Sequence, residues 1–90
     1  VNVDARLGIR NWEITNELDG LYWLRQAKRG QPKRAAELGA IFARAAAAMK
    51  AVDPSIRLGG PAATRPDHVG DLRDFIRAAG PHLSFLSFHA

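Results

Sequence analysis

Residues 35–58, AAELGAIFARAAAAMKAVDPSIRL, contain the pattern that decides the fold class. Apolar residues recur in the first part of this stretch at alternating spacings of three and four, which places them on one face of a helix. These residues are Ala35, Leu38, Phe42, Ala45, Met49 and Val52. Pro32 suits the first turn of this helix, and Asp53-Pro54 ends it because a residue before proline avoids helical backbone. Residues 55–58 then predict a short strand, closed by Gly59-Gly60-Pro61.

Two further strands and a second helix are expected on either side of this unit. Residues 9–15 are rich in residue types that favour a sheet. Residues 68–79 predict a helix, and Gly80 suits a left-handed helix stop. The apolar face of this helix consists of Val69, Leu72, Phe75, Ile76 and Ala79. Residues 83–88 predict a last strand, so apolar that it suits a parallel strand covered on both faces.

The predicted order is therefore strand, helix, strand, helix, strand. Such alternation implies right-handed crossovers and a parallel sheet. We expect the three strands to be parallel neighbours in chain order, with both helices on one side of the sheet. A doubly wound sheet and a (β/α) barrel both fit this order, and periodicity alone does not choose between them.

The composition is that of a globular protein. Of 90 residues, 47% are hydrophobic and 24% are charged, which argues against disorder. The absence of cysteine excludes a disulfide scaffold and a thiolate metal site. No apolar run approaches the ~20 residues of a membrane span, so we predict no membrane partner.

Five of the 13 basic residues fall within residues 25–34 of this chain, which has a net charge of +4. They are Arg25, Lys28, Arg29, Lys33 and Arg34. A phosphate-binding patch and a solvated loop are the two interpretations. We favour the solvated loop and predict no nucleic-acid partner, because no nucleic-acid motif accompanies the charge.

Polar residues and glycines recur where the three predicted strands end. These ends are Asn16-Glu17, Gly59-Gly60 and His89. In an α/β barrel the carboxyl ends of the strands lie on one face of the sheet, and the active site is built there. The pattern therefore predicts a site at this end of the sheet.

Three blocks of the sequence resemble one clan of enzymes. Residues 12–19, WEITNELD, look like the W-E-x-x-N-E-P-D signature of clan A glycoside hydrolases. Residues 52–62, VDPSIRLGGPA, look like the fifth strand of that clan, and residues 85–89, FLSFH, look like the end of the sixth. The sequence is most similar to glycoside hydrolase family 39, which includes β-xylosidases and α-L-iduronidases.

The resemblance implies a partial (β/α)8 TIM barrel, covering about strands four to six with two intervening helices. A complete barrel needs about 250 residues. We therefore expect residues 1–90 to be a fragment of a glycoside hydrolase catalytic barrel. We also expect the apolar strand 83–88 to be covered by the rest of the barrel or by another copy of the chain.

The resemblance also assigns roles to three residues. Glu17 would be the general acid/base, which protonates the glycosidic oxygen and later deprotonates water. Asn16 would hydrogen-bond the 2-hydroxyl of the sugar, and His89 would line the sugar pocket. Read without the resemblance, Glu17 would be a solvated loop residue, Asn16 a turn residue and His89 a structural residue.

Other residues receive more modest predictions. Glu13 shares the strand parity of Glu17, so we expect it to point into the barrel as a buried structural carboxylate with a cationic partner. Leu18 stands where the family usually has proline. Tyr22 and Trp23 could stack on a sugar or pack in the core.

The predicted function is that of a retaining, xylosidase-like O-glycoside hydrolase with a carbohydrate substrate. The nucleophile of this family belongs to the seventh strand, so residues 1–90 alone should be inactive. The alternatives are a non-catalytic carbohydrate-binding or structural barrel, and a self-associating half-barrel. We predict no cofactor and no metal, because no histidines and carboxylates have metal-binding spacing.

Overall fold

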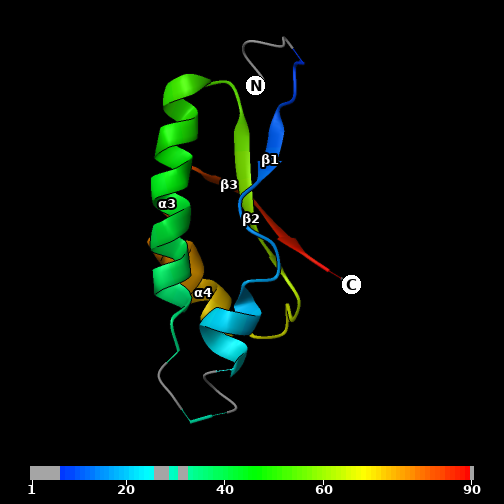
Figure 1. The fold of residues 1–90 in the computed structure, drawn as a ribbon, viewed down its shortest axis with the longest axis vertical. Coiled ribbons are helices and arrows are strands. Elements are labelled where there is room, and N and C mark those ends of the chain that lie inside the picture. The colour runs from blue at the N-terminus through cyan, green and yellow to red at the C-terminus, as the bar shows by residue number, and fades with distance from the viewer. Residues whose placement is uncertain (1–6, 26–28, 31–32, 90) are drawn as a thin grey trace.

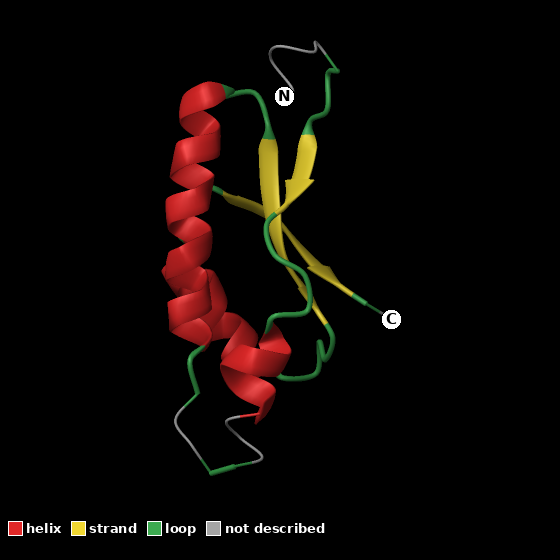
Figure 2. Cartoon of the chain, in the orientation of Figure 1, coloured by secondary structure: helices red, strands yellow, loops and turns green. Residues whose placement is uncertain are grey.

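The computed structural model describes residues 7–25, 29–30 and 33–89. Two residues of the sequence predictions, Lys28 and Pro32, lie outside these ranges. Three strands and two longer helices alternate along the chain, and a short π-helical turn follows the first strand (Figure 1, Figure 2). In order these elements are β1 (Asn11–Glu13), η1 (Gly20–Leu24), α3 (Ala35–Val52), β2 (Arg57–Ala63), α4 (Val69–Ala79) and β3 (Leu83–Phe88).

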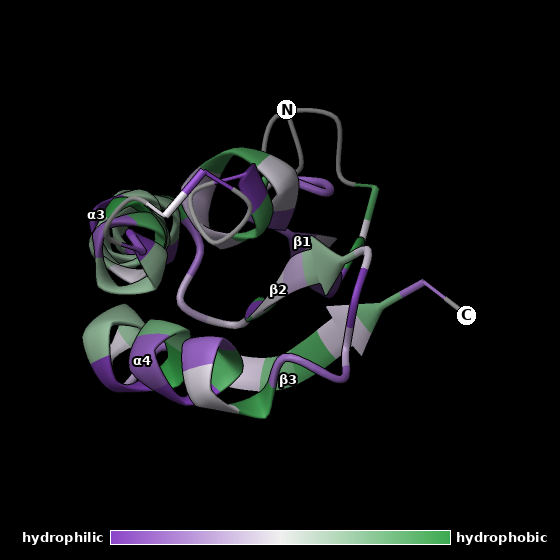
Figure 3. Ribbon diagram, turned by 90° about the horizontal axis from the view of Figure 1, so that it is seen from below, coloured by the Kyte–Doolittle hydropathy of each residue, from purple (hydrophilic) through white to green (hydrophobic). Residues whose placement is uncertain are grey.

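The three strands form one parallel sheet in the order β1-β2-β3. This confirms the predicted strand order and direction. Figure 3 shows α3 and α4 together on one side of the sheet, with β3 extending past them towards the C-terminus. The fold is therefore a small α/β unit with a three-stranded parallel sheet, in which each crossover carries one α-helix and the first also carries η1.

The strand boundaries differ from the predicted ones at β1 and β2. β1 is only three residues long, because Thr15 has a φ of 74° and leaves the extended conformation. β2 begins at Arg57 and runs to Ala63, so the prediction that Gly59-Gly60-Pro61 closes this strand was wrong. The strand pairs with β3 across all three of these residues and with β1 up to Gly59.

Close neighbours explain why β2 carries two glycines. A Cβ atom on Gly59 would collide with the ring of Phe85, and one on Gly60 would lie 2.8 Å from the carbonyl oxygen of Ile14. The glycines therefore allow β1 and β3 to approach β2 closely. Their function is packing within the sheet, not the strand exit that we predicted.

The core lies between the helices and the sheet. Leu38 and Phe42 of α3 are fully buried, as predicted, but Ala46 is buried instead of Ala45, and Val52 is 71% exposed. On α4 the buried apolar residues are Phe75 and Ala79. The buried cluster consists of Trp23, Ala35, Leu38, Phe42, Ala46, Ile56, Leu58, Phe75 and Ala79.

The outer edge of the sheet is less covered than the sequence predicts. Leu86 and Phe88 of β3 are 47% and 59% exposed, so within this chain β3 is not buried on both faces. Ile76 of α4 lies beside this edge and is also exposed. Among the described residues, no helix has the length and hydrophobicity needed to cross a bilayer.

The two long helices meet at Gly39. A Cβ atom there would lie 2.5 Å from the backbone oxygen of Phe75 and 2.7 Å from the Cβ atom of Ala78. These distances are far below van der Waals contact. The absence of a side chain at this position therefore lets α3 and α4 pack backbone to backbone.

Gly39→Ala is therefore expected to destabilise the fold, although alanine favours helices by up to about 1 kcal/mol. Overpacking typically costs about 1–3 kcal/mol, and the obstructing atom here is rigid backbone. Gly70→Ala in α4 is the control, since nothing lies within 4 Å of its Cβ position. Urea unfolding should show a lower free energy of unfolding for Gly39→Ala and an undiminished one for Gly70→Ala. Equal stability of both variants would contradict this helix contact.

Candidate active site

The carboxyl ends of β1 and β3 bring two predicted site residues into contact. Oε1 of Glu17 lies 2.6 Å from Nδ1 of His89, although the two residues are 72 positions apart in the sequence. Both side chains are 47% exposed. The parallel direction of the strands produces this contact, because it places the carboxyl ends of β1 and β3 at the same end of the sheet.

The end of β2 positions both residues through their backbones. The Glu17 N–H donates to the carbonyl of Ala62 at 3.1 Å, and the His89 N–H donates to the carbonyl of Ala63 at 2.9 Å. The Ala62 N–H in turn donates to Oγ of Ser87 at 3.0 Å. Two consecutive residues of the central strand therefore fix the spacing of Glu17 and His89.

Three non-glycine residues around this contact adopt left-handed backbone. The φ angles are 74° at Thr15, 55° at Glu17 and 53° at Ala62. Such conformations cost about 1–3 kcal/mol each and persist only where the surroundings enforce them. Thr15 is the most unusual, since β-branched residues rarely have positive φ. The strain is concentrated at the predicted site.

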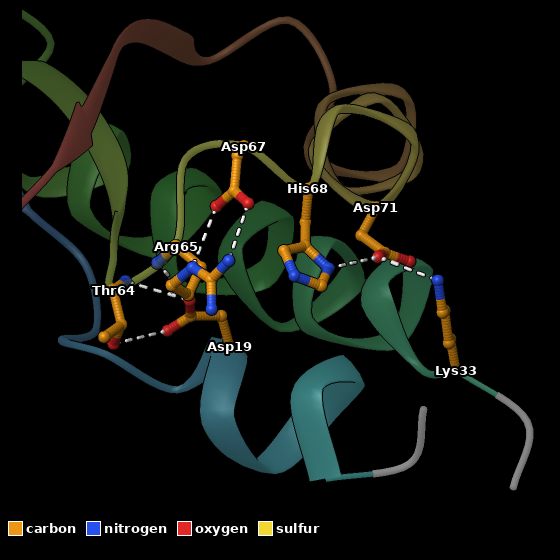
Figure 4. Close-up of polar contacts among 7 residues, drawn as sticks. All are labelled: Asp19, Lys33, Thr64, Arg65, Asp67, His68 and Asp71. Atoms are coloured by element: carbon orange, nitrogen blue, oxygen red, sulfur yellow. Dashed lines mark hydrogen bonds and ion pairs between the residues drawn. The ribbon is translucent and has the colours of Figure 1, made fainter. Parts of the chain in front are cut away.

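Asp19 is a buried member of this region that the sequence interpretation missed. Its side chain is completely buried and accepts three hydrogen bonds. The N–H of Thr64 donates at 2.9 Å, the hydroxyl of Thr64 at 3.1 Å and the N–H of Arg65 at 3.1 Å (Figure 4). The signal was its place at the end of the WEITNELD block, but the sequence interpretation gave Asp19 no role of its own.

The loop after β2 also carries an exposed ion pair. The Arg65 guanidinium contacts Asp67 at 2.7 Å and 2.9 Å. Hydrogen bonding to Arg65 lowers the pKa of the Asp67 carboxyl, and the same bond raises the pKa of Arg65. The pair therefore stabilises the fold above the ordinary aspartate pKa and loses this effect as the pH falls. Because both groups are exposed, the contribution is small.

A second buried aspartate lies farther from Glu17. Asp71 of α4 is 5% exposed and contacts Nζ of Lys33 at 3.1 Å and Nδ1 of His68 at 3.5 Å. Figure 4 shows this cluster at the start of α4, apart from the Asp19 hydrogen bonds. It joins the start of α4 to the segment that precedes α3. The His68 side chain is partly buried at this contact.

The remaining predicted residues have varied environments. Asn16 is exposed beside Glu17. Glu13 is exposed within residues 7–25, 29–30 and 33–89, and its burial inside a complete barrel stays a prediction. Glu13 pairs in register with Gly59. A Cβ atom built on Gly59 would point at the ring of Phe85. Glu13 therefore belongs to the sheet face opposite the helices, and nothing within the described residues covers it there.

The two aromatic residues of η1 have packing functions. Trp23 is fully buried in the core, where its indole N–H has no hydrogen-bond partner among the described residues. The guanidinium of Arg34 lies 4.9 Å from the centre of the Tyr22 ring, and the Arg34 N–H donates to the Tyr22 carbonyl. Of the two interpretations, core packing therefore holds for Trp23.

Chemically, the site offers a carboxyl group hydrogen-bonded to an imidazole. Both groups are partly exposed and lie at the carboxyl ends of the strands. Within residues 7–25, 29–30 and 33–89, no three histidine or acidic side chains are grouped as a metal site would require. Comparisons with protein-family models, with curated proteins and with solved structures found no match. The chemistry of the site therefore has to be argued from its residues.

Proposed function

We propose that this chain is part of the catalytic barrel of a retaining, xylosidase-like O-glycoside hydrolase. The observation that carries the proposal is the 2.6 Å contact between Glu17 and His89 at the carboxyl ends of two parallel strands. A titratable pair at this edge is where a (β/α) barrel places its chemistry. The resemblance of residues 12–19 to the clan A signature supports Glu17 as the general acid/base.

Glu17 would act in both halves of the reaction. As an acid it would give its proton to the glycosidic oxygen as the leaving group departs. As a base it would then remove a proton from the water that releases the sugar. The hydrogen bond between Glu17 and His89 engages Oε1, so we assign proton transfer to Oε2. Asn16 is adjacent and exposed, where it could reach the 2-hydroxyl of the substrate.

The nucleophile of the proposed reaction lies outside residues 1–90. Retaining enzymes need a second carboxyl group about 5 Å from the first, across the sugar. Glu13 is the last residue of β1, four positions before Glu17, so we do not assign it as the group across the bound sugar. The rest of the barrel would supply the nucleophile, and either it or another copy of this chain would cover Leu86 and Phe88. Residues 1–90 alone would then be inactive.

A non-catalytic carbohydrate-binding barrel is the second candidate. The observation that favours it is the exposure of Glu17, whose side chain is 47% accessible. A carboxylic acid that has to hold a proton near neutral pH is usually buried. In the first proposal the missing part of the barrel provides this burial, whereas in the second no burial is needed.

The stereochemistry of hydrolysis tests the proposal. The full-length protein that carries this segment is incubated with an aryl β-xyloside, and proton NMR follows the released sugar before it mutarotates. We expect the β-anomer to form first, because two displacements retain configuration. Initial α-anomer would contradict the retaining mechanism. Sugar binding without turnover would favour the non-catalytic candidate.

A further inference from the structure

Asp19 is a buried side chain with three hydrogen bonds in the site region, and the proposed function does not use it. Its carboxylate is completely buried. One oxygen, Oδ2, accepts the N–H groups of Thr64 and Arg65, and Oδ1 accepts the hydroxyl of Thr64. Hydrogen bonds to an ionised acceptor are roughly twice as strong as neutral ones. The group therefore fastens two loops together.

The proposed acid/base residue, Glu17, lies in the first of these loops, which follows β1. The end of β2 and the loop after it hold that segment. Glu17 is bonded through its N–H to Ala62, and Asp19, two residues later, is bonded to Thr64 and Arg65. The segment 17–19 is thus held at Glu17 and at Asp19 by one short stretch, residues 62–65. His89 is bonded to Ala63 in the middle of that stretch.

The conformation of Glu17 needs such support. Its φ of 55° is unfavourable for a residue with a side chain, and such backbone persists only when its surroundings determine it. Without Asp19, the anchor of segment 17–19 to residues 64 and 65 would be lost. Glu17 could then relax towards an ordinary backbone conformation and move its carboxyl group away from His89.

We infer that Asp19 is a positioning residue that holds Glu17 in the orientation required for proton transfer. The inference rests on the proposed function of Glu17. Proton transfer depends on placement, and a displacement of about 1 Å can cost about 10²-fold in rate. Asp19 itself touches neither substrate nor reacting atoms in this scheme.

Asp71 provides the matched control. It is also a buried aspartate, at 5% exposure, but it is bonded to Lys33 and His68 and not to residues 62–65. Asp71→Ala should therefore destabilise the fold without displacing Glu17. Asp19→Asn is the conservative variant, because asparagine can still accept the two N–H groups and donate to the Thr64 hydroxyl.

The experiment measures kcat and KM of the full-length protein on an activated aryl xyloside and on an unactivated xyloside. For Asp19→Ala we expect kcat on the unactivated substrate to fall about 10²-fold per folded molecule, with KM little changed. The loss should be smaller on the activated substrate, whose leaving group needs little protonation, and azide should restore part of it. Asp19→Asn should retain most of the activity. Any loss of activity in Asp71→Ala should be the same on both substrates.

Two further variants keep the outcomes separate. If azide fails to rescue Glu17→Gln, the proposed function is wrong, whatever Asp19 does. If Glu17→Gln is rescued but Asp19→Ala loses activity equally on both substrates without an azide effect, the positioning inference alone is overturned. If Asp19→Ala does not fold, Thr64→Val decides, because it removes only the hydroxyl contact. It should show a milder loss with the same substrate dependence, and a loss without that dependence would overturn the inference.

Discussion

Glu17→Gln is expected to lower the activity of the full-length protein by about 10²- to 10⁴-fold on unactivated xylosides, the usual value of general acid/base assistance. Glutamine keeps the shape of the side chain but cannot deliver a proton. An activated aryl glycoside departs with little acid assistance, so its glycosylation step should survive better. Steady-state and pre-steady-state kinetics on both substrates would measure the difference.

The second half of the reaction, hydrolysis of the covalent intermediate, should distinguish the Glu17→Gln variant most clearly. Water still needs a base to attack the covalent intermediate, so the intermediate should accumulate on the activated substrate. Azide needs no base and should restore turnover, with a glycosyl azide as the product. Mass spectrometry of the trapped enzyme and of the product checks both expectations. Hydrolysis at the original rate would contradict the assignment of Glu17.

Glu13→Gln is the matched control, since it removes a carboxyl group at the end of β1, four positions before Glu17. Glu13 is exposed and pairs with Gly59 well before the end of β2. We expect no azide rescue in this variant, and any effect should be on stability rather than on the acid/base step. If azide rescued the Glu13 variant and left the Glu17 variant unchanged, the assignment of the two carboxyl groups would be reversed.

The elements that local patterns determine could be predicted well. The helix at residues 35–52 ends where Asp53-Pro54 requires it, and β3 covers the predicted residues 83–88. Parallel strand order follows from the crossover rule. The parallel strand order also places Glu17 and His89 at the same end of the sheet, so their proximity could be expected from the sequence.

The features that the sequence did not reveal depend on partners distant in the chain. Gly59 and Gly60 signalled a strand end, but Phe85 and Ile14 make them necessary inside β2. Gly39 gave no signal, because its requirement comes from the backbone of α4. Asp19 received no role of its own from the sequence, and only the position of the loop after β2 makes it a buried acceptor.

Phe42→Ala is expected to produce the largest loss of stability among these substitutions, about 3–5 kcal/mol. Phe42 is fully buried at the centre of the core, and its ring packs edge to face against Phe75 with 5.8 Å between ring centres. It also lies beneath the central strand, since its Cδ2 atom is 3.9 Å from the Cβ position of Gly60. Truncation would leave a cavity between α3, α4 and β2.

Ile41→Ala controls for the neighbouring position of the same helix. Ile41 is 38% exposed, so its truncation should cost less than about 1 kcal/mol. Small domains have only about 5–15 kcal/mol of stability in total, which means that the Phe42 variant should be partly unfolded where the Ile41 variant is native. Urea unfolding monitored by circular dichroism gives both values. Equal midpoints would mean that α3 does not bury Phe42 against α4 and β2, and that the strand end carrying Glu17 is supported in another way.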